Sequence, residues 1–217
     1  MSDSPTTLGA AIRTFARYPS PRILAVATAT LVAARSVLGE WSRADLLIPL
    51  IVLAFWPIQE WLIHVFVLHY RPFGLFGRTI DFPVPHSHRA HHADPWNLDL
   101  VFIPTHVFTY YSIPLQLFLW LKLAPTSQLA ATGLAIYFVL TLHYEWVHYL
   151  VHTRYGPRSR FYDRLWRNHR LHHCKNENYW FGVTMLGGDR LLRTAPRFET
   201  VATSATCRTL GLELIDA

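Results

Sequence analysis

The chain has 217 residues, of which 51% are hydrophobic and only 16% are charged, against about 25% charged in a typical soluble domain. Its eight Trp, thirteen Phe and ten Tyr exclude an intrinsically disordered chain, because so much apolar surface favours burial. Two cysteines, Cys174 and Cys207, are too few for a disulfide framework. The formal charge of +6 is compatible with three settings for the basic residues: binding to nucleic acid, binding to a membrane surface, or a position on the cytoplasmic side of a membrane protein.

Four apolar stretches predict the fold, and they lie at 23–38, 46–68, 100–123 and 129–151. A helix needs about 20 residues to cross the apolar core of a bilayer, so the last three stretches are long enough and the first is marginal. Short connections at 39–45 and 124–128 predict two helical hairpins. We therefore predict an all-α integral membrane protein with four transmembrane helices and a helical cytoplasmic cap, forming a single domain over 1–217.

The charge distribution predicts the orientation of these spans. Most Lys and Arg residues lie before the first stretch, in 70–99 and beyond 153, which four crossings place on one side. The positive-inside rule makes that side cytoplasmic, together with both termini. Arg35 is expected to extend toward water at the other surface. A soluble all-α protein is the alternative, but it would show amphipathic stripes, whereas 46–56 is apolar all round. The polar start predicts no signal peptide.

Ten of the thirteen histidines lie in four short groups at, or just beyond, the cytoplasmic ends of the apolar stretches. Neutral imidazole is the commonest metal ligand in proteins and suits zinc, iron and copper. Ten imidazoles exceed the roughly four to six ligands that one first-row ion takes, so two ions are expected. The groups read HVFVLH, HRAHH, HYLVH and HRLHH, and the predicted ligands are His64, His69, His88, His91, His92, His148, His152, His169, His172 and His173.

The spacing within these groups has a geometric meaning. If 86–93 is helical, His88, His91 and His92 should point together, and the HRLHH group should repeat the arrangement. The HYLVH pair is spaced i, i+4. His64 and His69 are five residues apart, about 140° around an ideal helix, so they either serve two different ions or straddle the end of the helix.

Three histidines lie outside the groups. His106 is interpreted as a polar or interfacial residue without a metal, whereas His86 and His143 remain open as reserve candidates. A pH-sensing cluster or a histidine-rich buffering tract is an alternative for the groups themselves, but buffering tracts lack defined helical spacing.

Four carboxylates are expected to orient the imidazoles through their second ring nitrogen. Glu60 and Glu145 each lie about one helical turn before a histidine of the groups, and Asp94 and Asp189 are further acceptors in the cap. No catalytic residue is predicted beyond the metal centre. Residues 179–181 are aromatic and are candidates for the wall of a substrate channel.

The four histidine groups resemble the fatty acid hydroxylase superfamily over about residues 45–195. They are most similar to its fatty acid 2-hydroxylase branch, whose pattern is HX4H, HX2HH, HX3H and HX2HH. Related sterol desaturases usually open with HX3H, and carotenoid hydroxylases usually have four residues within the third pair, where HYLVH has three. The segments HHADPWNLDLVFIP and FGVTMLGGDRLLRT also resemble the family.

The resemblance implies a membrane-bound di-iron oxygenase that uses O2 and electrons to hydroxylate a lipid or fatty acyl chain. Zinc is expected to replace iron in overexpressed protein. Eukaryotic 2-hydroxylases carry a fused haem domain that 1–44 cannot form, so a separate electron-donor protein is expected. The runner-up is a sterol, carotenoid or other lipid desaturase or hydroxylase with the same centre.

Two further function classes are weighed against an enzyme. A metal transporter or sensor would place its ligands near the bilayer midplane, whereas these histidines lie at helix ends. Nucleic acid is not an expected partner, because no binding motif accompanies the basic residues. The position of the histidines instead predicts attack near the polar end of a membrane lipid.

Overall fold

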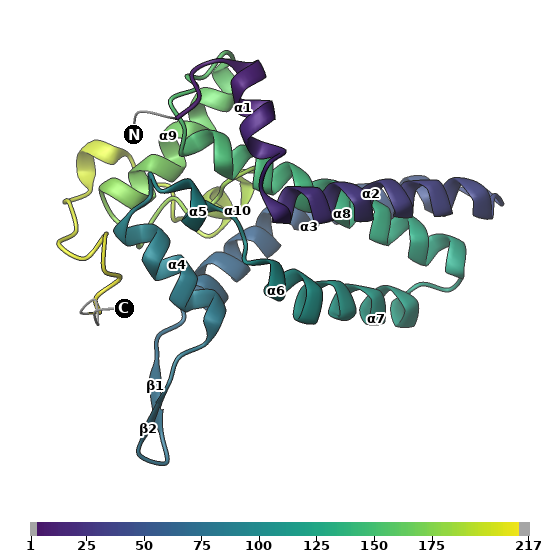
Figure 1. The fold of residues 1–217 in the computed structure, drawn as a ribbon, viewed down its shortest axis with the longest axis horizontal. Coiled ribbons are helices and arrows are strands. Elements are labelled where there is room, and N and C mark those ends of the chain that lie inside the picture. Colours follow the sequence, from purple (N-terminus) through teal and green to yellow (C-terminus); the bar gives the residue numbers. More distant parts are fainter. Residues whose placement is uncertain (1–3, 213–217) are drawn as a thin grey trace.

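The computed structural model describes residues 4–212 as a mostly helical protein (Figure 1). Two short antiparallel strands, β1 (Phe73–Leu75) and β2 (Arg78–Ile80), form a hairpin that projects from the body. The all-α prediction is therefore right for the bulk of the chain and wrong for this hairpin. The helices are α1 (Leu8–Phe15), α2 (Pro19–Leu38), α3 (Ala44–Ile63), η1 (His64–Leu68), α4 (Pro83–Ala93), α5 (Leu98–Val101), α6 (Thr105–Val107), η2 (Phe108–Ser112), α7 (Ile113–Leu123), α8 (Ser127–Val151), α9 (Arg160–Cys174), α10 (Gly187–Leu191) and η3 (Phe198–Thr200).

The long helices form one end of the molecule, and the short ones gather at the other. Helix α8 contacts α2, α3 and α7, and α2, α7 and α8 extend together to the same end (Figure 1). The opposite end is built from α1, α4, α5, α9, α10 and the C-terminal segment 201–212, which together are called the cap. The histidine groups lie in this cap or at the helix ends that enter it.

Within residues 4–212, two helices are long and apolar enough to cross a membrane. They are α2, with 20 residues, and the continuous helix Ala44–Leu68, with 25 residues. Exposed apolar side chains such as Leu46, Leu50 and Phe55 cover α3, as expected for a surface that faces lipid. The predicted first and second spans therefore coincide with helices of suitable length and composition.

The third and fourth stretches have a different form. The third is divided among α5, α6, η2 and α7, with Pro104 at the start of α6, because proline provides no N–H for a continuous helix. The fourth is the single 25-residue helix α8, which carries Glu145 and His148 near its cap end and is largely buried. The crossing of a membrane by these two stretches stays a prediction.

Local sequence signals set the ends of the helices. Helix α2 begins at Pro19, a residue favoured in the first turn, and it ends before Gly39, whose φ of 58° favours glycine. Thr126 and Ser159 precede α8 and α9, and each side-chain oxygen accepts a hydrogen bond from a backbone N–H three residues later.

Arg35 does not extend into water as predicted. Its side chain is buried and donates hydrogen bonds to Asp45 Oδ1 (2.6 Å), Thr132 Oγ1 (2.7 Å) and the Gly39 carbonyl (2.6 Å). A buried charge is tolerated when it is paired and its remaining donors are satisfied. The network joins α2, α3 and α8 at the end of the molecule far from the cap.

Apolar packing between α8 and α9 determines how the cap is attached. Val147 and Val151 of α8, Leu165 of α9 and Val183 form one buried cluster. The contact holds the cap end of α8 against α9, so that the histidines of both helices face the same interior.

Candidate metal centre

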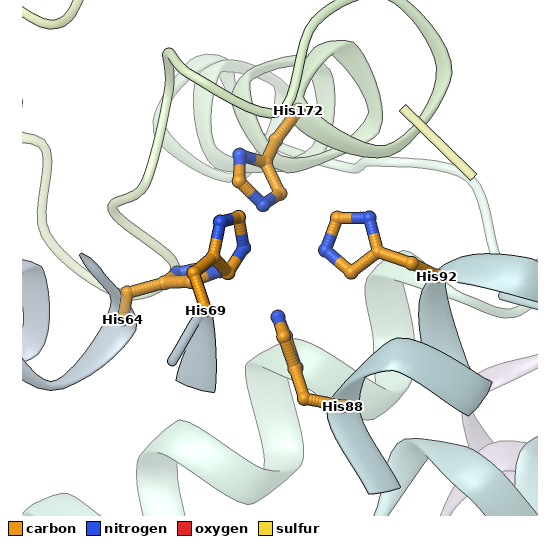
Figure 2. Close-up of side chains that lie close together, drawn as sticks. All are labelled: His64, His69, His88, His92 and His172. Atoms are coloured by element: carbon orange, nitrogen blue, oxygen red, sulfur yellow. The ribbon is translucent and has the colours of Figure 1, made fainter. Parts of the chain in front are cut away.

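The ten predicted histidines converge in two clusters, and within each cluster one ring nitrogen per residue lies within 4.8 Å of the others. Nine of the ten residues are buried and His69 is half-buried. Figure 2 shows the rings of the first cluster pointing toward a common centre. The first cluster is His64, His69, His88, His92 and His172; the second cluster is His91, His148, His152, His169 and His173.

A one-turn π-helix brings His64 and His69 together. The N–H of His69 donates to the His64 carbonyl (3.1 Å), closing a turn of five residues. An α-helix would set the two side chains about 140° apart, whereas a five-residue turn returns them to one side. Both residues therefore belong to the first cluster, and their ring centroids are 5.1 Å apart.

Each HxxHH group is divided between the two clusters. His88 and His92 join the first cluster, whereas His91 joins the second. Helix α9 divides in the same way, with His172 in the first cluster and the other two in the second. The prediction that all three histidines of a group point together is wrong. On a helix, the first and last of them (i and i+4) differ in direction by about 40°, whereas the middle one (i+3) lies about 60° from the first on the opposite side. Helices α4 and α9 thus contribute to both clusters.

Backbone carbonyls orient three imidazoles of the first cluster. A carbonyl oxygen only accepts, so the Nδ1 atom that faces it carries the proton and Nε2 carries the free lone pair. This arrangement is the usual support of a metal-binding histidine. The pairs are His64 Nδ1 with Phe181 (2.7 Å), His172 Nδ1 with Tyr179 (2.8 Å) and His92 Nδ1 with Cys207 (2.9 Å).

The remaining nitrogens of the first cluster fit a metal ion. Among residues 4–212, all five Nε2 atoms are buried without a hydrogen-bond partner. Such orphaned groups are costly in a protein interior unless something else binds them. Opposite nitrogens about 2.1 Å from one ion would be about 4.2 Å apart, close to the observed spread of up to 4.8 Å.

The second cluster has the same character. Both ring nitrogens of His91 and of His152 are buried without a partner among the described residues, as is Nε2 of His148. The Nε2 atoms of His169 and His173 lie 3.0 Å apart. Five imidazole nitrogens in this space provide a second set of donors for an ion.

Burial keeps the cap histidines neutral. Loss of contact with water lowers the pKa of His92 to about 3 and holds the pKa of His88, His91 and His173 well below the ordinary value. Neutral imidazole is the form that binds metal.

Two of the four predicted carboxylates act on a loop rather than on an imidazole. Glu60 accepts hydrogen bonds from the backbone N–H (3.0 Å) and hydroxyl (2.7 Å) of Thr184. Asp189 accepts from the N–H of Phe181 (2.9 Å) and of Gly182 (2.7 Å). Both carboxylates are buried, and they hold the segment 181–185, whose first carbonyl orients His64.

The other two carboxylates lie elsewhere. Glu145 is buried and accepts a hydrogen bond from the N–H of Ile103 (2.9 Å), which ties α8 to the segment before α6. Asp94 is exposed at the end of α4. Within residues 4–212, no hydrogen bond joins any of the four carboxylates to a clustered histidine, so the expected direct contact is not observed.

The histidines outside the predicted groups lie outside both clusters. His106 and His143 are exposed, and exposed His86 is 2.9 Å from Asp81 Oδ2. The segment 179–181, a candidate for the wall of a substrate channel, lies against the first cluster, where it supplies two of the orienting carbonyls.

The C-terminal segment contributes to the site without any signal in the sequence. Its Cys207 carbonyl orients His92, and Arg208 donates to the carbonyl of Ala93 at the end of α4 (3.1 Å). A backbone carbonyl is present at every residue, so no residue pattern could have indicated this contact.

The profile of the fatty acid hydroxylase family matches residues 49–194, more than half of the chain. The chain belongs to the fatty acid hydroxylase family. The resemblance inferred from the histidine groups is thereby confirmed. The profile ends before Cys207, so the C-terminal part of this hydroxylase-family site lies beyond the matched residues.

Two known proteins extend the comparison. A dihydroceramide fatty acyl 2-hydroxylase of Arabidopsis thaliana is 27% identical over 148 residues, which cover 68% of this chain and 60% of that relative. The chain thus matches less than two thirds of the relative's length. The solved structure of full-length scs7p, in which only the hydroxylase domain is visible, has a TM-score of 0.64 and 18% identity, and the match covers 94% of this chain and 72% of that one. This likeness shows a shared fold.

Proposed function

We propose that this protein is a membrane-bound, non-haem di-iron oxygenase that hydroxylates a lipid or fatty acyl chain with O2 and external electrons. The observation that carries the proposal is the pair of buried clusters, each with imidazole nitrogens that have no hydrogen-bond partner among residues 4–212. Membership of the fatty acid hydroxylase family and the acyl 2-hydroxylase relative support the substrate class.

In this proposal all ten clustered histidines are ligands, and each cluster binds one iron ion. Two redox-active ions held by neutral imidazoles would activate O2 for attack on an unactivated C–H bond. The chain's own part is positioning: the carbonyls of Phe181 and Tyr179 keep Nε2 of their histidines free, and burial excludes water. Zinc would occupy the same nitrogens in overexpressed protein.

We place the two clusters at the cytoplasmic boundary of a four-span membrane domain formed by residues 1–217, with both termini in the cytoplasm. Support comes from His64, which directly follows the apolar helix α3, and from His148 and His152 at the cap end of α8. A lipid whose tail stays in the bilayer would then present carbons close to its polar end. Hydroxylation near that end is the expected outcome.

The electrons are proposed to come from a separate donor protein. Exposed arginines of α9, among them Arg160 and Arg164, give the cap surface a positive charge that suits an acidic donor.

The test combines metal analysis with lipid analysis. Purified protein is expected to hold two first-row ions per chain, and a host that expresses it under labelled O2 is expected to form acyl lipids with labelled oxygen near the polar end. One ion or none in folded protein would contradict the two-cluster assignment. New double bonds without labelled oxygen would show a desaturase, and oxygen found only beyond mid-chain would refute the boundary geometry.

A further inference from the structure

The β1–β2 hairpin leaves the body between η1 and α4 and points away from it, crosswise to the direction in which α2, α7 and α8 extend (Figure 1). The elements on its two sides belong to the first cluster. The turn of η1 brings His64 and His69 together, and α4 carries His88 and His92. Anything that anchors the hairpin would therefore also anchor both elements that form this cluster.

The tip of the hairpin holds an aromatic residue in an unfavourable backbone conformation. Leu75 pairs with Arg78, so Phe76 and Gly77 form a two-residue turn, and their φ angles are 48° and 72°. Positive φ at both positions is characteristic of the type I′ turn, which favours Asn-Gly because a bulky side chain is strained there. The Phe76 side chain is 95% exposed, so packing within residues 4–212 does not offset the strain. A strained residue of this kind points to a function, which for an exposed ring lies outside the chain.

One face of the hairpin is apolar apart from a single arginine. Alternate residues of a strand point to the same side, so the register places four side chains on this face: Phe73, Leu75, Arg78 and Ile80. The opposite face of the paired strands has only Gly74 and Thr79. Phe73 and Leu75 are exposed, and the long side chain of exposed Arg78 can carry its charge beyond the apolar surface.

This apolar face continues the exposed apolar surface of the helix Ala44–Leu68. Exposed Phe66 lies in the last turn of that helix, which is long and apolar enough to cross a membrane. Phe73 follows Leu68 by five residues, and five extended residues span at most about 18 Å. The base of the hairpin therefore lies close to the level at which the helix would leave the bilayer.

Three exposed aromatic rings surround the base of the hairpin. The ring centroid of Tyr70 lies 6.1 Å from that of Phe73 and 5.9 Å from that of Phe82. Tyrosine is enriched at the membrane–water interface, because its ring favours an apolar neighbour and its hydroxyl stays in water. The base thus has the composition of a segment at the surface of a bilayer.

We propose that the hairpin lies on the cytoplasmic surface of the bilayer, with its apolar face toward the lipid and the Phe76 ring inserted below the phosphate groups. Arg78 would contact those phosphates, whose negative charge complements its own. A second copy of the chain could instead pair with a free strand edge, but edge pairing leaves the exposed Phe76 ring unexplained. The inference rests on the proposed function, which places the clusters at this boundary, and it makes the hairpin the anchor that fixes the depth of the first cluster.

The test measures the depth of nitroxide spin labels in the full-length, metal-loaded protein, in nanodiscs of equal parts phosphatidylcholine and phosphatidylserine. Each label is attached to one introduced cysteine in a Cys174→Ser background, since Cys207 is buried. Collisions with O2, which concentrates in the bilayer, are compared with collisions with a water-soluble nickel chelate. Leu50→Cys, on the exposed side of α3, is the standard for lipid, and Thr203→Cys, exposed in the cap, is the standard for water.

The two faces of the hairpin should differ in this measurement. The label of Leu75→Cys should favour O2 as that of Leu50→Cys does, whereas the label of Thr79→Cys should favour the nickel chelate. Nickel access at Leu75→Cys equal to that at Thr203→Cys would overturn the proposal. Protection of Leu75→Cys only in discs that hold two copies of the chain would also overturn it and would identify a second copy as the partner.

Phe76→Asn is the decisive variant because it removes the ring and improves the turn. Asn-Gly is the favoured type I′ sequence, so Tm in detergent should not fall. Loss of the buried ring should lower the ratio of inserted to detached hairpin about tenfold or more, seen as increased nickel access at Leu75→Cys. Phe161→Asn, at an exposed phenylalanine of α9, is the matched control and should leave that access unchanged. Unchanged access in Phe76→Asn would refute insertion of the ring.

The same labels separate this inference from the proposed function. If the label of Leu50→Cys were open to the nickel chelate, α3 would lie outside the bilayer, and both the membrane topology and the hairpin inference would fall. If Leu50→Cys were shielded and Leu75→Cys were not, only the hairpin inference would fall. Protein without metal or hydroxylated product that still showed the expected labelling would refute the oxygenase and support the anchor.

Discussion

His172 shows how a backbone contact fixes one side of an imidazole and leaves its other nitrogen free. Its Nδ1 faces the Tyr179 carbonyl at 2.8 Å, and its Nε2 is buried without a partner among the described residues. The backbone selects the tautomer and the ring direction, so the free nitrogen points at the other members of the first cluster (Figure 2). A substitution here removes a donor atom without touching the apolar helices.

His172→Ala should therefore abolish product while membrane insertion remains intact, because insertion depends on the apolar stretches. We expect metal content to fall from two ions toward one, as measured by elemental analysis of purified protein. His106→Ala is the control and should keep most activity, since His106 is exposed and outside both clusters. An equal loss of activity in both variants would show that the division of the histidines into metal ligands and non-ligands is wrong.

Asp189 is the second residue whose loss should be costly. Its carboxylate is fully buried and accepts hydrogen bonds from the N–H of Phe181, the N–H of Gly182 and the hydroxyl of Thr194. Asp189→Asn would turn an NH2 group toward these donors and should lower the free energy of unfolding by about 2–3 kcal/mol. Denaturant unfolding in detergent micelles measures the change.

The control for that experiment is Asp163→Asn. Asp163 forms a partly exposed ion pair with Arg167 on α9 at 2.9 Å, and exposed pairs contribute less than about 1 kcal/mol. A loss for Asp163→Asn as large as that for Asp189→Asn would contradict the role assigned to the buried hydrogen bonds.

At the scale of elements, the spacing of histidines predicted which of them cluster but not how they divide between the two clusters. Helical periodicity places His88 and His92 on one side, and the structure agrees. The π-turn after His64 could not be inferred, because π-turns have no residue signature comparable to a helix cap. The contact between His92 and the Cys207 carbonyl could not be inferred either, because Cys207 contributes only a backbone atom and is distant from His92 in the sequence.

Close packing of α10 against α3 yields a prediction at this scale. A Cβ added at Gly188 would overlap the carbonyl oxygen of Pro57 and lie 3.0 Å from Cβ of Trp61. Because backbone cannot move aside cheaply, Gly188→Ala should lower the free energy of unfolding by about 1–3 kcal/mol. The shift would also disturb the segment 181–185 and reduce metal retention.

Gly156→Ala is the matched control for Gly188→Ala. A Cβ at Gly156 meets nothing within 4 Å, so stability should change by less than about 0.5 kcal/mol. Thermal unfolding of both variants in the same detergent, with metal content measured in parallel, compares them. Equal stability of the two variants would contradict the close approach of α10 to α3.

At the scale of the whole molecule, polar groups are concentrated at the two ends of the helical bundle. The cap holds the histidine clusters, and the far end holds the buried network of Arg35, Asp45 and Thr132. Between them, α3 presents exposed apolar side chains such as Leu50 and Phe55. This distribution suits a bundle that crosses a bilayer with its cap on one side.

The proposed four-span topology makes a prediction for each connection. Ser42 lies between α2 and α3, and Ser127 begins α8; both are exposed and should face away from the cytoplasm. In sealed inside-out vesicles, a membrane-impermeant maleimide should therefore label wild-type protein at exposed Cys174, whereas Cys207 is buried. Ser42→Cys and Ser127→Cys, each combined with Cys174→Ser, should react only after the vesicles are opened.

Ser127 decides between two structures of the second hairpin. Helix α7 is preceded by the break at Pro104, and α8 is largely buried, so a hairpin that enters the bilayer without crossing it is the competing arrangement. Labelling of Ser127→Cys in sealed vesicles, with Ser42→Cys still protected, would establish that arrangement. Helices α7 and α8 contact each other, and α8 also contacts α2 and α3. Helix α2 and the helix that begins with α3 are, within residues 4–212, the ones long and apolar enough to span a membrane. Because α8 packs against both, we expect it to cross the bilayer with them and Ser127 to be protected.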